Sequence, residues 1–555
     1  MKIVSTKGVI PFRPTVLACA ILACTTQVHA FQIDTGDSEL KLRWDNTVKY
    51  TTAFRLKDQS PGLNTSHDDN QDDGDQNFDK GLISNRVDLL TEFDGSYKNL
   101  GFRVSGAAWY DDVYHQDTDN DSGTSNHTPA SEFSDETKEV MGGDTDLLDA
   151  FVYGRFDFNE GTATVRLGRH TLLWGESLFY GANGIAGGMA PINVVKLQSV
   201  PNTTFKDAAL PIGKLSVDLP LNDLVSVSGY VGYEYEKTQL PPAGSYFSAS
   251  DALEGERIVV GGPLGFERDA DMEPSDYGQY GLNVRWYDED LDSDFGLYAI
   301  RYHAFTPSQN NLRANPPSGP GAPDFDSYSW AYHEGIRAFG ASIATSIDNW
   351  SVAGEISYRE NQPLASGPNA LTVNPVPGYY TFNNTDNPGY AVGRTAHAQV
   401  SWIASLDPNF ISDETSFIGE IAWNTRIGVD KNEYLLNPFS DRSAVGIKMV
   451  FTPTYRQLFS GVDISVPVGV SYTHGKSSAL GNSFGVDRGG DFNIGVNALV
   501  LNEWKINAKY VTYYGPEGGT LIDAPNPSGT DQPTVSYRQN LADRDFFSLS
   551  ISTTF

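Results

Sequence analysis

An alternation of apolar and polar residues with a period of two recurs along most of this chain, and it constrains the fold more than any other feature. Clear examples are residues 40–45, 225–236, 419–427 and 492–500. Successive side chains of a β-strand point to opposite faces, so each segment has one apolar and one polar face. Segments of about ten such residues that end in aromatic residues are typical of the wall of a transmembrane β-barrel. The strands of a soluble β-sandwich or β-solenoid show the same alternation, so the lengths of the links between the segments are needed to distinguish these folds from a membrane barrel.

Short and long links between these segments follow each other in alternation along most of the chain. Short links lie at 97–101, 221–223, 347–349 and 502–503, whereas 170–212 is one of the long ones. Outer-membrane barrels have short periplasmic turns and long outer loops, so this rhythm predicts an antiparallel up-and-down barrel with periplasmic termini. We expect about 18 strands, with 16 as the nearest alternative. The candidate strands lie near 39–55, 82–97, 101–114, 146–158, 161–169, 213–220, 224–237, 277–288, 295–305, 329–347, 350–361, 390–405, 415–429, 442–453, 462–474, 487–501, 504–514 and 541–555.

The segment 547–555 carries the strongest single signal for a barrel. Its alternate positions are apolar, and the chain ends on Phe555. In a barrel this last strand has to pair with the first, because hydrocarbon offers no partners to the free backbone groups of a sheet edge. A buried C-terminal strand of a soluble protein can look similar, but after a secretory leader the pattern favours the barrel.

The first thirty residues have the build of a secretory signal peptide, with a basic start, an apolar run and a small-residue cleavage site at 28–30. The apolar run is too short to span a bilayer. We therefore expect residues 1–30 to be removed and residues 31–555 to form a single outer-membrane barrel. Both cysteines, Cys19 and Cys24, lie in the leader, so the mature chain has no disulfide or thiolate site. A lipid anchor on Cys24 is the alternative, disfavoured because Leu22 stands where a smaller residue is usual.

The charge of the chain excludes one class of partner. The formal net charge is −31, and the leader carries three basic and no acidic residues, which leaves −34 for residues 31–555. So acidic a protein repels a phosphate backbone, and we expect no nucleic-acid partner. Outer-membrane lipids are the expected surroundings of the barrel.

The stretch 168–212 breaks the alternation and is too apolar for a solvated loop. An outer loop packed on itself would explain it, but we favour a hatch folded into the lumen, as non-strand segments are in large barrels. Inward charges of both signs on the early strands either solvate a pore or tether the hatch, because buried charges need partners. The residues expected to line or latch the hatch are Arg169, Trp174, Glu176 and Lys206, and the lumen candidates are Arg43, Arg86, Asp88 and Arg103.

Two of the long links are rich in acidic residues. The start of one, 69–74, resembles a calcium loop, but its twelfth position is Lys80, where an EF-hand needs a bidentate glutamate. No confident metal site follows, and a solvated acidic loop is the simpler interpretation. The weak candidates for a surface Ca²⁺ or Mg²⁺ ion are Asp69, Asp73, Asp117, Asp119 and Asp121.

We expect no catalytic centre and no cofactor. The histidines of residues 31–555 have no metal-ligand spacing, and no Gly-x-Ser-x-Gly motif occurs. An outer-membrane lipase could place a Ser–His pair on a barrel wall without such a motif. Its best candidate is His397, on an inward face beside Gln399 and Ser401. A structural role explains this histidine better.

Several motifs between 160 and 250 are distinctive. They are Gly168-Arg169 followed by Leu173-Trp174-Gly175-Glu176, then Phe205-Lys206-Asp207 with Leu210-Pro211, then Tyr233-Glu234-Tyr235-Glu236-Lys237-Thr238 and Leu240-Pro241-Pro242-Ala243-Gly244-Ser245-Tyr246-Phe247-Ser248. Together with residues 31–55 they resemble the proteobacterial outer-membrane family known as domain of unknown function 1302. The likeness covers the mature chain. Asp207 and Ala208 depart from the more strongly charged pattern expected after Lys206, which leaves the role of that turn open.

The resemblance implies an outer-membrane barrel often encoded beside a periplasmic partner of unknown function and an RND-type inner-membrane transporter. It further implies movement of hydrophobic or amphipathic cargo, small molecules or lipids, across the envelope. It supplies no binding or catalytic residues. The alternatives are a general diffusion porin and a surface adhesin or receptor that uses the long acidic loops.

Overall fold

The computed structural model describes residues 31–36, 38–64, 70–121, 125–158, 161–200, 202–261, 264–315, 324–367, 369–373, 382–525 and 531–555. The predicted leader 1–30 and the candidate ligand Asp69 lie outside the described residues. Among the helices that are described, none combines the length and the apolar character needed to cross a membrane.

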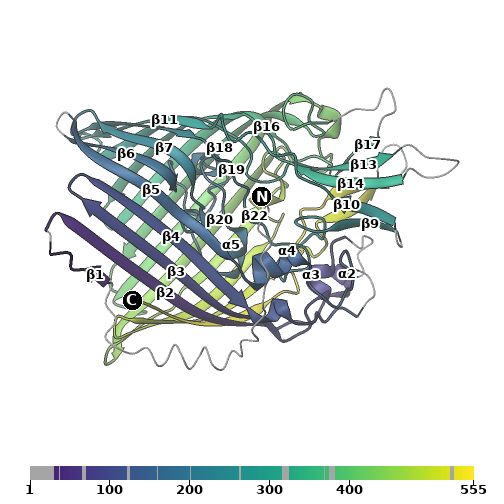
Figure 1. The fold of residues 1–555 in the computed structure, drawn as a ribbon, viewed down its shortest axis with the longest axis horizontal. Helices are drawn as coiled ribbons and strands as arrows, with labels where there is room; N and C mark the ends of the chain where they lie inside the picture. The colour runs from purple at the N-terminus through teal and green to yellow at the C-terminus, as the bar shows by residue number, and fades with distance from the viewer. Residues whose placement is uncertain are drawn as a thin grey trace.

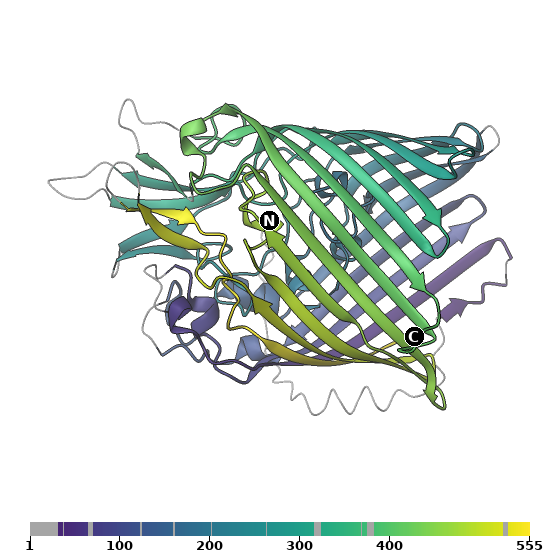
Figure 2. The ribbon, with the colours of Figure 1, turned by 180° about the vertical axis from the view of Figure 1, so that it is seen from behind.

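Eighteen antiparallel wall strands form one closed barrel (Figures 1 and 2). Each strand pairs with the next along the chain, and the last pairs with the first, from Thr47 opposite Thr554 to Arg55 opposite Phe546. The alternative of 16 strands is therefore excluded. The wall consists of β2 (Leu40–Arg55), β3 (Leu82–Tyr97), β4 (Leu100–Asp111), β5 (Thr145–Phe158), β6 (Gly161–His170), β7 (Ile212–Pro220), β8 (Val225–Gly232), β11 (Tyr280–Asp288), β12 (Ser293–Tyr302), β15 (Ile336–Ile347), β16 (Trp350–Pro363), β18 (Val392–Leu406), β19 (Glu414–Lys431), β20 (Ser443–Phe459), β21 (Val462–Ser465) with β22 (Val468–His474) as one strand, β23 (Gly490–Val500), β24 (Trp504–Tyr514) and β27 (Phe546–Thr554).

The two faces of the wall follow from the strand register. Residues that pair directly across neighbouring strands share one face, so the pairings sort apolar from charged side chains. On the outer face Trp44 pairs with Phe93 and Phe93 with Val104, whereas one residue along, Arg43 pairs with Asp94 and Asp94 with Arg103. The alternation in the sequence is thus an apolar exterior and a charged lumen.

The short turns lie at one end of the barrel, here called the turn end, and the long links at the other, the loop end (Figure 1). The C-terminus and a short added strand, β1 (Phe31–Ile33), which pairs with β2, lie at the turn end. The loop end carries further strands, in segments that the sequence pattern predicts as links. They are β9 (Arg257–Gly261), β10 (Leu264–Arg268), β13 (Gln309–Asn315), β14 (Asp324–Ala331), β17 (Asn369–Val373), β25 (Leu521–Pro525) and β26 (Asp531–Val535).

Two of the predicted strands are divided in the structure, one because the chain changes sheets and the other by a proline. The segment expected at 329–347 is divided, since residues up to Ala331 belong to β14 of the loop sheet and the wall strand begins only at Ile336. Pro467 divides β21 from β22, since proline has no N–H to donate to the ladder.

The helices of the described residues are all short. They are α2 (Pro61–Asn64), α3 (Asp73–Gln76), η1 (Asp112–His115), α4 (Asp135–Thr137), η2 (Lys138–Gly142), η3 (Ile185–Gly188), α5 (Val194–Ser199), α6 (Phe205–Ala208), η4 (Glu433–Leu435) and η5 (Gly481–Phe484).

An aromatic cluster, here called the loop cap, packs on the strand ends at the loop end of the barrel. Its core is Phe78, Tyr114, Phe133, Tyr246 and Phe247, which pack on Ala53, Ile83, Val511 and Phe546 of β2, β3, β24 and β27. Two buried arginines hold this cap to the wall. Arg55 pairs with Asp75 at 2.6 Å and Asp543 at 3.1 Å, and Arg544 donates to the carbonyl oxygens of Tyr246 and Ser248 at 2.6 and 2.5 Å. The Leu240–Ser248 motif is thus part of the cap.

Candidate functional site

The hatch, defined as residues 171–211, connects β6 to β7 through the interior of the barrel. Its described residues, which leave out position 201, include η3, α5 and α6. They contact inward side chains of wall strands from β7, where Lys214 donates to the Met189 carbonyl at 3.1 Å, to β23, where Asn493 accepts from Asn202 at 2.8 Å. A segment with so little regular structure leaves many backbone groups without partners, and buried backbone groups need them. The wall supplies these partners with a few buried polar side chains.

Glu420 on β19 is the largest single anchor of the hatch. Its carboxylate, 0% exposed, accepts hydrogen bonds from the backbone N–H of Leu178 (3.1 Å), Phe179 and Tyr180 (2.9 Å). The same carboxylate accepts a bond from the Ser177 hydroxyl at 2.9 Å. Hydrogen bonds to an ionised acceptor are about twice as strong as neutral ones, so one side chain fixes four consecutive hatch residues.

Glu355 and Arg359 on β16 form a second anchor, which binds residue 176 and residues 182–185 of the hatch. Glu355 accepts from the N–H of Glu176 at 2.9 Å and of Ile185 at 2.7 Å. Arg359 donates to three consecutive carbonyl oxygens, those of residues 182, 183 and 184, at 2.8–2.9 Å. Acid and base thus bind donors and acceptors of one hatch turn, which leaves both charges compensated in a buried setting.

Asn183 lies at the centre of the contact between the hatch and β18 and β19. Its amide nitrogen lies within 3.3 Å of the carbonyl oxygens of residues 398 and 423. Its amide oxygen accepts from Asn424 at 3.2 Å and contacts Nδ1 of His397 at 3.1 Å. The other ring nitrogen of His397 contacts the Thr395 hydroxyl at 2.8 Å. His397 is therefore buried under the hatch with both nitrogens bonded, which fits the structural interpretation and leaves no room for a substrate beside it.

The opposite side of the hatch is apolar. Trp174 packs edge-on against Tyr230 of β8 at a ring distance of 5.3 Å and stacks near Tyr298 of β12 at 6.4 Å. Ile185 and Met189 join the same cluster. Burying a tryptophan in such a cluster contributes several kcal/mol, so this side resists release of the hatch about as strongly as the polar anchors do.

The other three hatch candidates occupy different positions. Glu176 pairs with Arg285 of β11 at 3.1 Å, so its side chain joins hatch to wall. Arg169 lies on β6 just before the hatch begins. It pairs with Glu234 and with Glu236 at 3.2 Å, and it donates to the carbonyl of Pro211 at 3.3 Å, where the hatch ends. Lys206 is exposed on α6, and within the described chain no ion pair involves it.

Gly175 of the Trp-Gly-Glu motif has a physical reason to be glycine. Its φ is +91°, a conformation that L side chains rarely adopt. A Cβ atom there would also lie 2.2 Å from a carboxylate oxygen of Glu355. The motif therefore brings the hatch backbone close enough to bond Glu355.

The charged lumen candidates lie on a different part of the wall, formed by β2 to β5 and here called the charged wall. Arg43 pairs with Asp45 at 2.6 Å, Arg86 with Asp88 at 2.7 Å, and Arg103 with Glu92, Asp94 and Asp149. Around Arg86 and Arg103 these side chains are 24–38% exposed, whereas Glu420, Glu355 and Arg359 under the hatch are 0–3% exposed. The hatch thus covers one part of the lumen wall, and the charged wall keeps contact with water.

Sequence reasoning named Arg43, Arg86, Asp88 and Arg103 but missed Glu355, Arg359 and Glu420 as anchors. A signal for these was present, because each stands at a polar position of a strand whose alternate positions are strongly apolar. The alternation does not show which of the inward charges the hatch covers, because every wall strand has the same alternating pattern.

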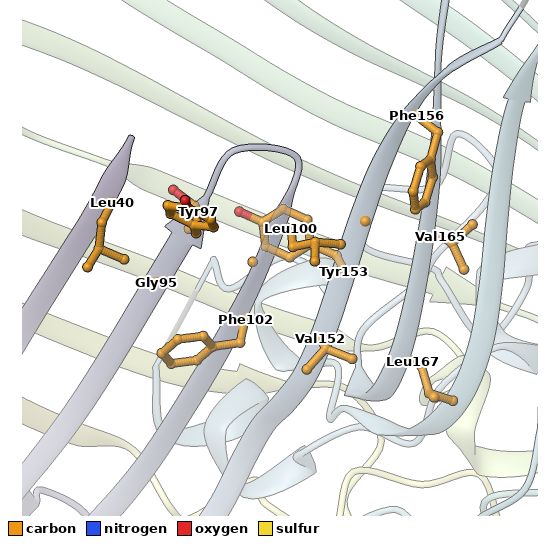
Figure 3. Close-up of a pocket in the computed structure, with 13 residues that line it drawn as sticks. Leu40, Gly95, Tyr97, Leu100, Phe102, Val152, Tyr153, Phe156, Val165 and Leu167 are labelled. Carbon is orange, nitrogen blue, oxygen red and sulfur yellow. The ribbon is translucent and has the colours of Figure 1, made fainter. Parts of the chain in front are cut away.

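A groove of about 450 Å³ lies on the outer face of β2 to β6 near the turn end (Figure 3). Leu100, Phe102, Val152, Phe156 and Leu167 line it. Phe102 pairs across to Val152, and Val152 to Leu167, a row that alternates with the inward charges. The groove therefore belongs to the apolar exterior and not to the lumen.

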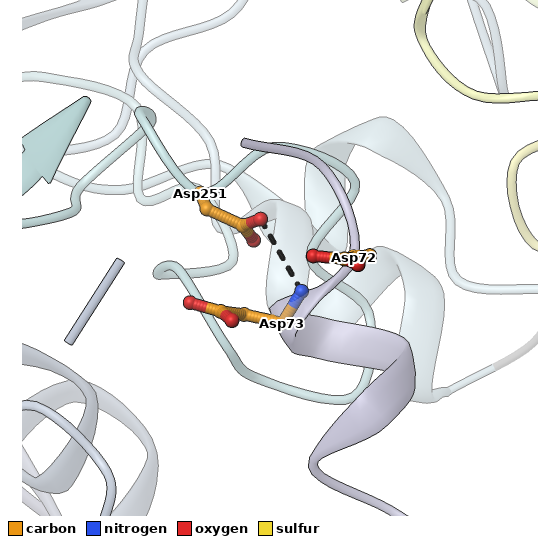
Figure 4. A group of neighbouring side chains, drawn as sticks. All are labelled: Asp72, Asp73 and Asp251. Carbon is orange, nitrogen blue, oxygen red and sulfur yellow. Dashed lines mark hydrogen bonds between the residues drawn. The ribbon is translucent and has the colours of Figure 1, made fainter. Parts of the chain in front are cut away.

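The acidic candidates for a surface cation do not come together. Asp117 and Asp121 are exposed, and Asp119 accepts a bond from the N–H of Asp79 at 2.9 Å. Asp73 is buried instead, beside Asp72 and Asp251 (Figure 4). Burial and the charges of Asp73 and Asp72 raise the pKa of Asp251 well above its usual range.

Solved outer-membrane proteins resemble the barrel at low sequence identity. The outer membrane channel DcaP of Acinetobacter baumannii aligns over 95% of this chain and 100% of its own, with 8% identity and a TM-score of 0.36. Pseudomonas aeruginosa OpdK with vanillate covers 93% of this chain and 98% of its own, with 7% identity and a TM-score of 0.40. Acinetobacter baumannii OccAB4 covers 94% and 100%, with 8% identity and a TM-score of 0.42. TM-scores this low carry no argument about what this chain transports.

No curated protein matches the sequence. A family model described as "Protein of unknown function (DUF1302)" matches residues 12–555, nearly the whole chain. The chain therefore belongs to the DUF1302 family.

Proposed function

We propose that this protein is an outer-membrane transport barrel that carries amphipathic or hydrophobic molecules through a gated passage along the charged wall. One observation carries the proposal: the hatch buries the inward faces of β16, β18 and β19 but leaves the charged wall of β2 to β5 in contact with water. A closed barrel with an apolar exterior is stable only in a bilayer, with the long loops outside and the short turns in the periplasm.

The passage is gated because the loop cap lies over the same side of the barrel. Ala53 and Ile83, against which the cap packs, belong to β2 and β3 of the charged wall. Val195 of hatch helix α5 also packs against the cap cluster. Cap and hatch therefore form one continuous obstacle at the loop end, and cargo passes only when one of them moves.

The lining favours amphipathic cargo. The path presents arginine and carboxylate side chains on the wall and aromatic rings at the cap, so a molecule with one polar and one apolar part finds partners at both. A periplasmic partner and an RND-type inner-membrane transporter are proposed on the strength of the family resemblance. They would engage the turn end, where the charged wall opens.

Conductance of the purified protein in planar bilayers tests the proposal. We expect small, intermittent currents from the wild type, because cap and hatch obstruct the lumen. Deletion of residues 175–205 should raise both the current and the uptake of large antibiotics by whole cells. A steady large current from the wild type, unchanged by the deletion, would contradict a gated passage.

A general diffusion porin is the second candidate, and the charged wall favours it, since charges of both signs are typical of water-filled lumens. A porin would give a steady large current in the wild type, whereas the gated barrel would give a small, intermittent one. An adhesin or receptor would depend on the loops alone, so trimming 56–81 and 115–145 would abolish binding to a surface ligand and spare transport. Because these loops carry Phe78 and Phe133 of the cap, we expect the trimming to open the channel instead.

A further inference from the structure

Three buried carboxylates from two separate loops meet inside the loop cap. Asp72 and Asp73 lie at the start of α3, and Asp251 precedes β9. One oxygen from each of the three lies within 4.8 Å of the others (Figure 4). Two oxygens on opposite sides of a bound Ca²⁺ are about 4.8 Å apart, twice a Ca–O distance of about 2.4 Å. The spacing is therefore that of a coordination shell.

A second feature points to the same place. Asn77 and Asn126, 6% and 2% exposed, line one cavity with Asp73 and Asp251. The amide nitrogens of both are bonded, that of Asn77 to the Gly244 carbonyl at 3.0 Å and that of Asn126 to the Arg257 carbonyl at 2.8 Å. Their buried amide oxygens accept no hydrogen bond from any described residue. A buried acceptor without a donor costs about 1–3 kcal/mol, so each of these two oxygens needs a partner that the protein does not supply. A bound cation would be such a partner.

The cavity beside these groups measures about 10 Å³, room for a single particle of the size of a water molecule or a metal ion. Carboxylate and amide oxygens together are the donor set of a hard divalent cation. Mg²⁺ usually keeps several of its waters, and a cavity this small has no room for them. Ca²⁺ takes six to eight oxygens in a flexible geometry, and carboxylates, mono- or bidentate, together with amide oxygens can supply most of them.

We propose that Asp72, Asp73, Asp251 and Asn126 bind one Ca²⁺ ion, with Asn77 completing the oxygen set. The ligands come from three loops, those that follow β2, β4 and β8. Asn77 directly precedes Phe78 of the cap. The ion therefore ties the three loops that carry the cap residues and holds the cap closed over the charged wall.

Calcium titration of the detergent-purified mature protein, free of lipopolysaccharide, tests the site by calorimetry. We expect one tight Ca²⁺ site per chain and much weaker binding of Mg²⁺. Asp251→Asn should weaken Ca²⁺ binding by at least about tenfold. The matched control is Asp117→Asn, which removes the same charge from an exposed loop position outside the cluster and should leave binding unchanged. Absence of a tight site, or equal binding by the Asp251→Asn variant, would overturn the proposal.

Protease resistance of the cap provides a readout that separates loss of the ion from loss of the fold. In the wild type, cleavage between residues 70 and 140 should be slow with Ca²⁺ and at least about tenfold faster with a chelator, since release of the ligands opens the loops. The Asp251→Asn variant should be insensitive to the chelator and, because one buried charge is gone, no less resistant than the chelated wild type. Equal resistance of the wild type with and without Ca²⁺ would also overturn the proposal. Asn126→Ala keeps all three carboxylates and should still weaken binding.

Discussion

Replacement of Glu420 by alanine tests whether the hatch is held by the wall. The substitution removes the acceptor of three backbone N–H groups, those of Leu178, Phe179 and Tyr180, and of the Ser177 hydroxyl. Each donor left without a partner costs about 1–3 kcal/mol, so the three backbone N–H groups alone cost the closed position about 3–9 kcal/mol. Even about 3 kcal/mol shifts the balance between the closed and released hatch by more than about a hundredfold.

Cysteine labelling measures this shift directly, because both natural cysteines lie in the predicted leader. Ala186, 4% exposed in η3 of the hatch, becomes the reporter as Ala186→Cys. Its reaction with a water-soluble maleimide should be at least about tenfold faster in the Glu420→Ala background, since a small rise in the released fraction dominates the rate.

Glu414→Gln is the matched control on the same strand. Glu414 pairs with Arg456 at 2.8 Å and is largely exposed, so its loss should leave labelling unchanged. If Glu420→Ala and Glu414→Gln label Ala186→Cys at the same rate as the parent, then Glu420 does not hold the hatch and the reasoning on anchors is refuted.

Three further predictions concern the hatch, the cap and an outer loop. Trp174→Ala should lower stability by about 3–5 kcal/mol, seen as a lower unfolding temperature in detergent, because it empties the cluster between hatch and β8. Arg55→Ala should destabilise the cap by about 3–5 kcal/mol, because Asp543 stays buried without this partner and Asp75 keeps only an ion pair with Arg544 at 3.6 Å. Lys80→Ala, which removes an exposed lysine paired with the exposed Asp58, should cost less than about 1 kcal/mol. Comparable protease sensitivity of the two variants would argue against the role of Arg55. Burial lowers the pKa of His333 from 6.5 to about 4, so the folded loop binds a proton less readily than the unfolded one. Its stability should therefore be complete above pH 6.5 and fall by about 3 kcal/mol as the pH drops to 4, measured by limited proteolysis, and His333→Gln should remove this dependence.

Much of the wall could be predicted from local pattern. The strand expected at 82–97 has those bounds in the structure, and β24 spans the predicted 504–514. Period-two alternation shows which side chains of a strand face the lipid, and it depends only on neighbouring residues. The loop sheet of β9, β10, β13, β14 and β17 was missed, because these strands pair among themselves above the wall and carry no long alternation.

The closed barrel could be predicted from local pattern, because an apolar face at every second residue is a property of neighbouring residues, and the stretch 168–212 stood out because it breaks that pattern. Where this stretch lies and which charges it covers depend on the folded arrangement of the whole chain. Glu420 and Glu92 are both acids at inward strand positions, yet the hatch buries the first and leaves the second in water. Likewise Asp73 and Asp117 look alike in acidic loops, but only Asp73 meets Asp251, 178 residues away in the chain. Contacts between such distant residues depend on how the loops close over the barrel, and no local pattern encodes that closure.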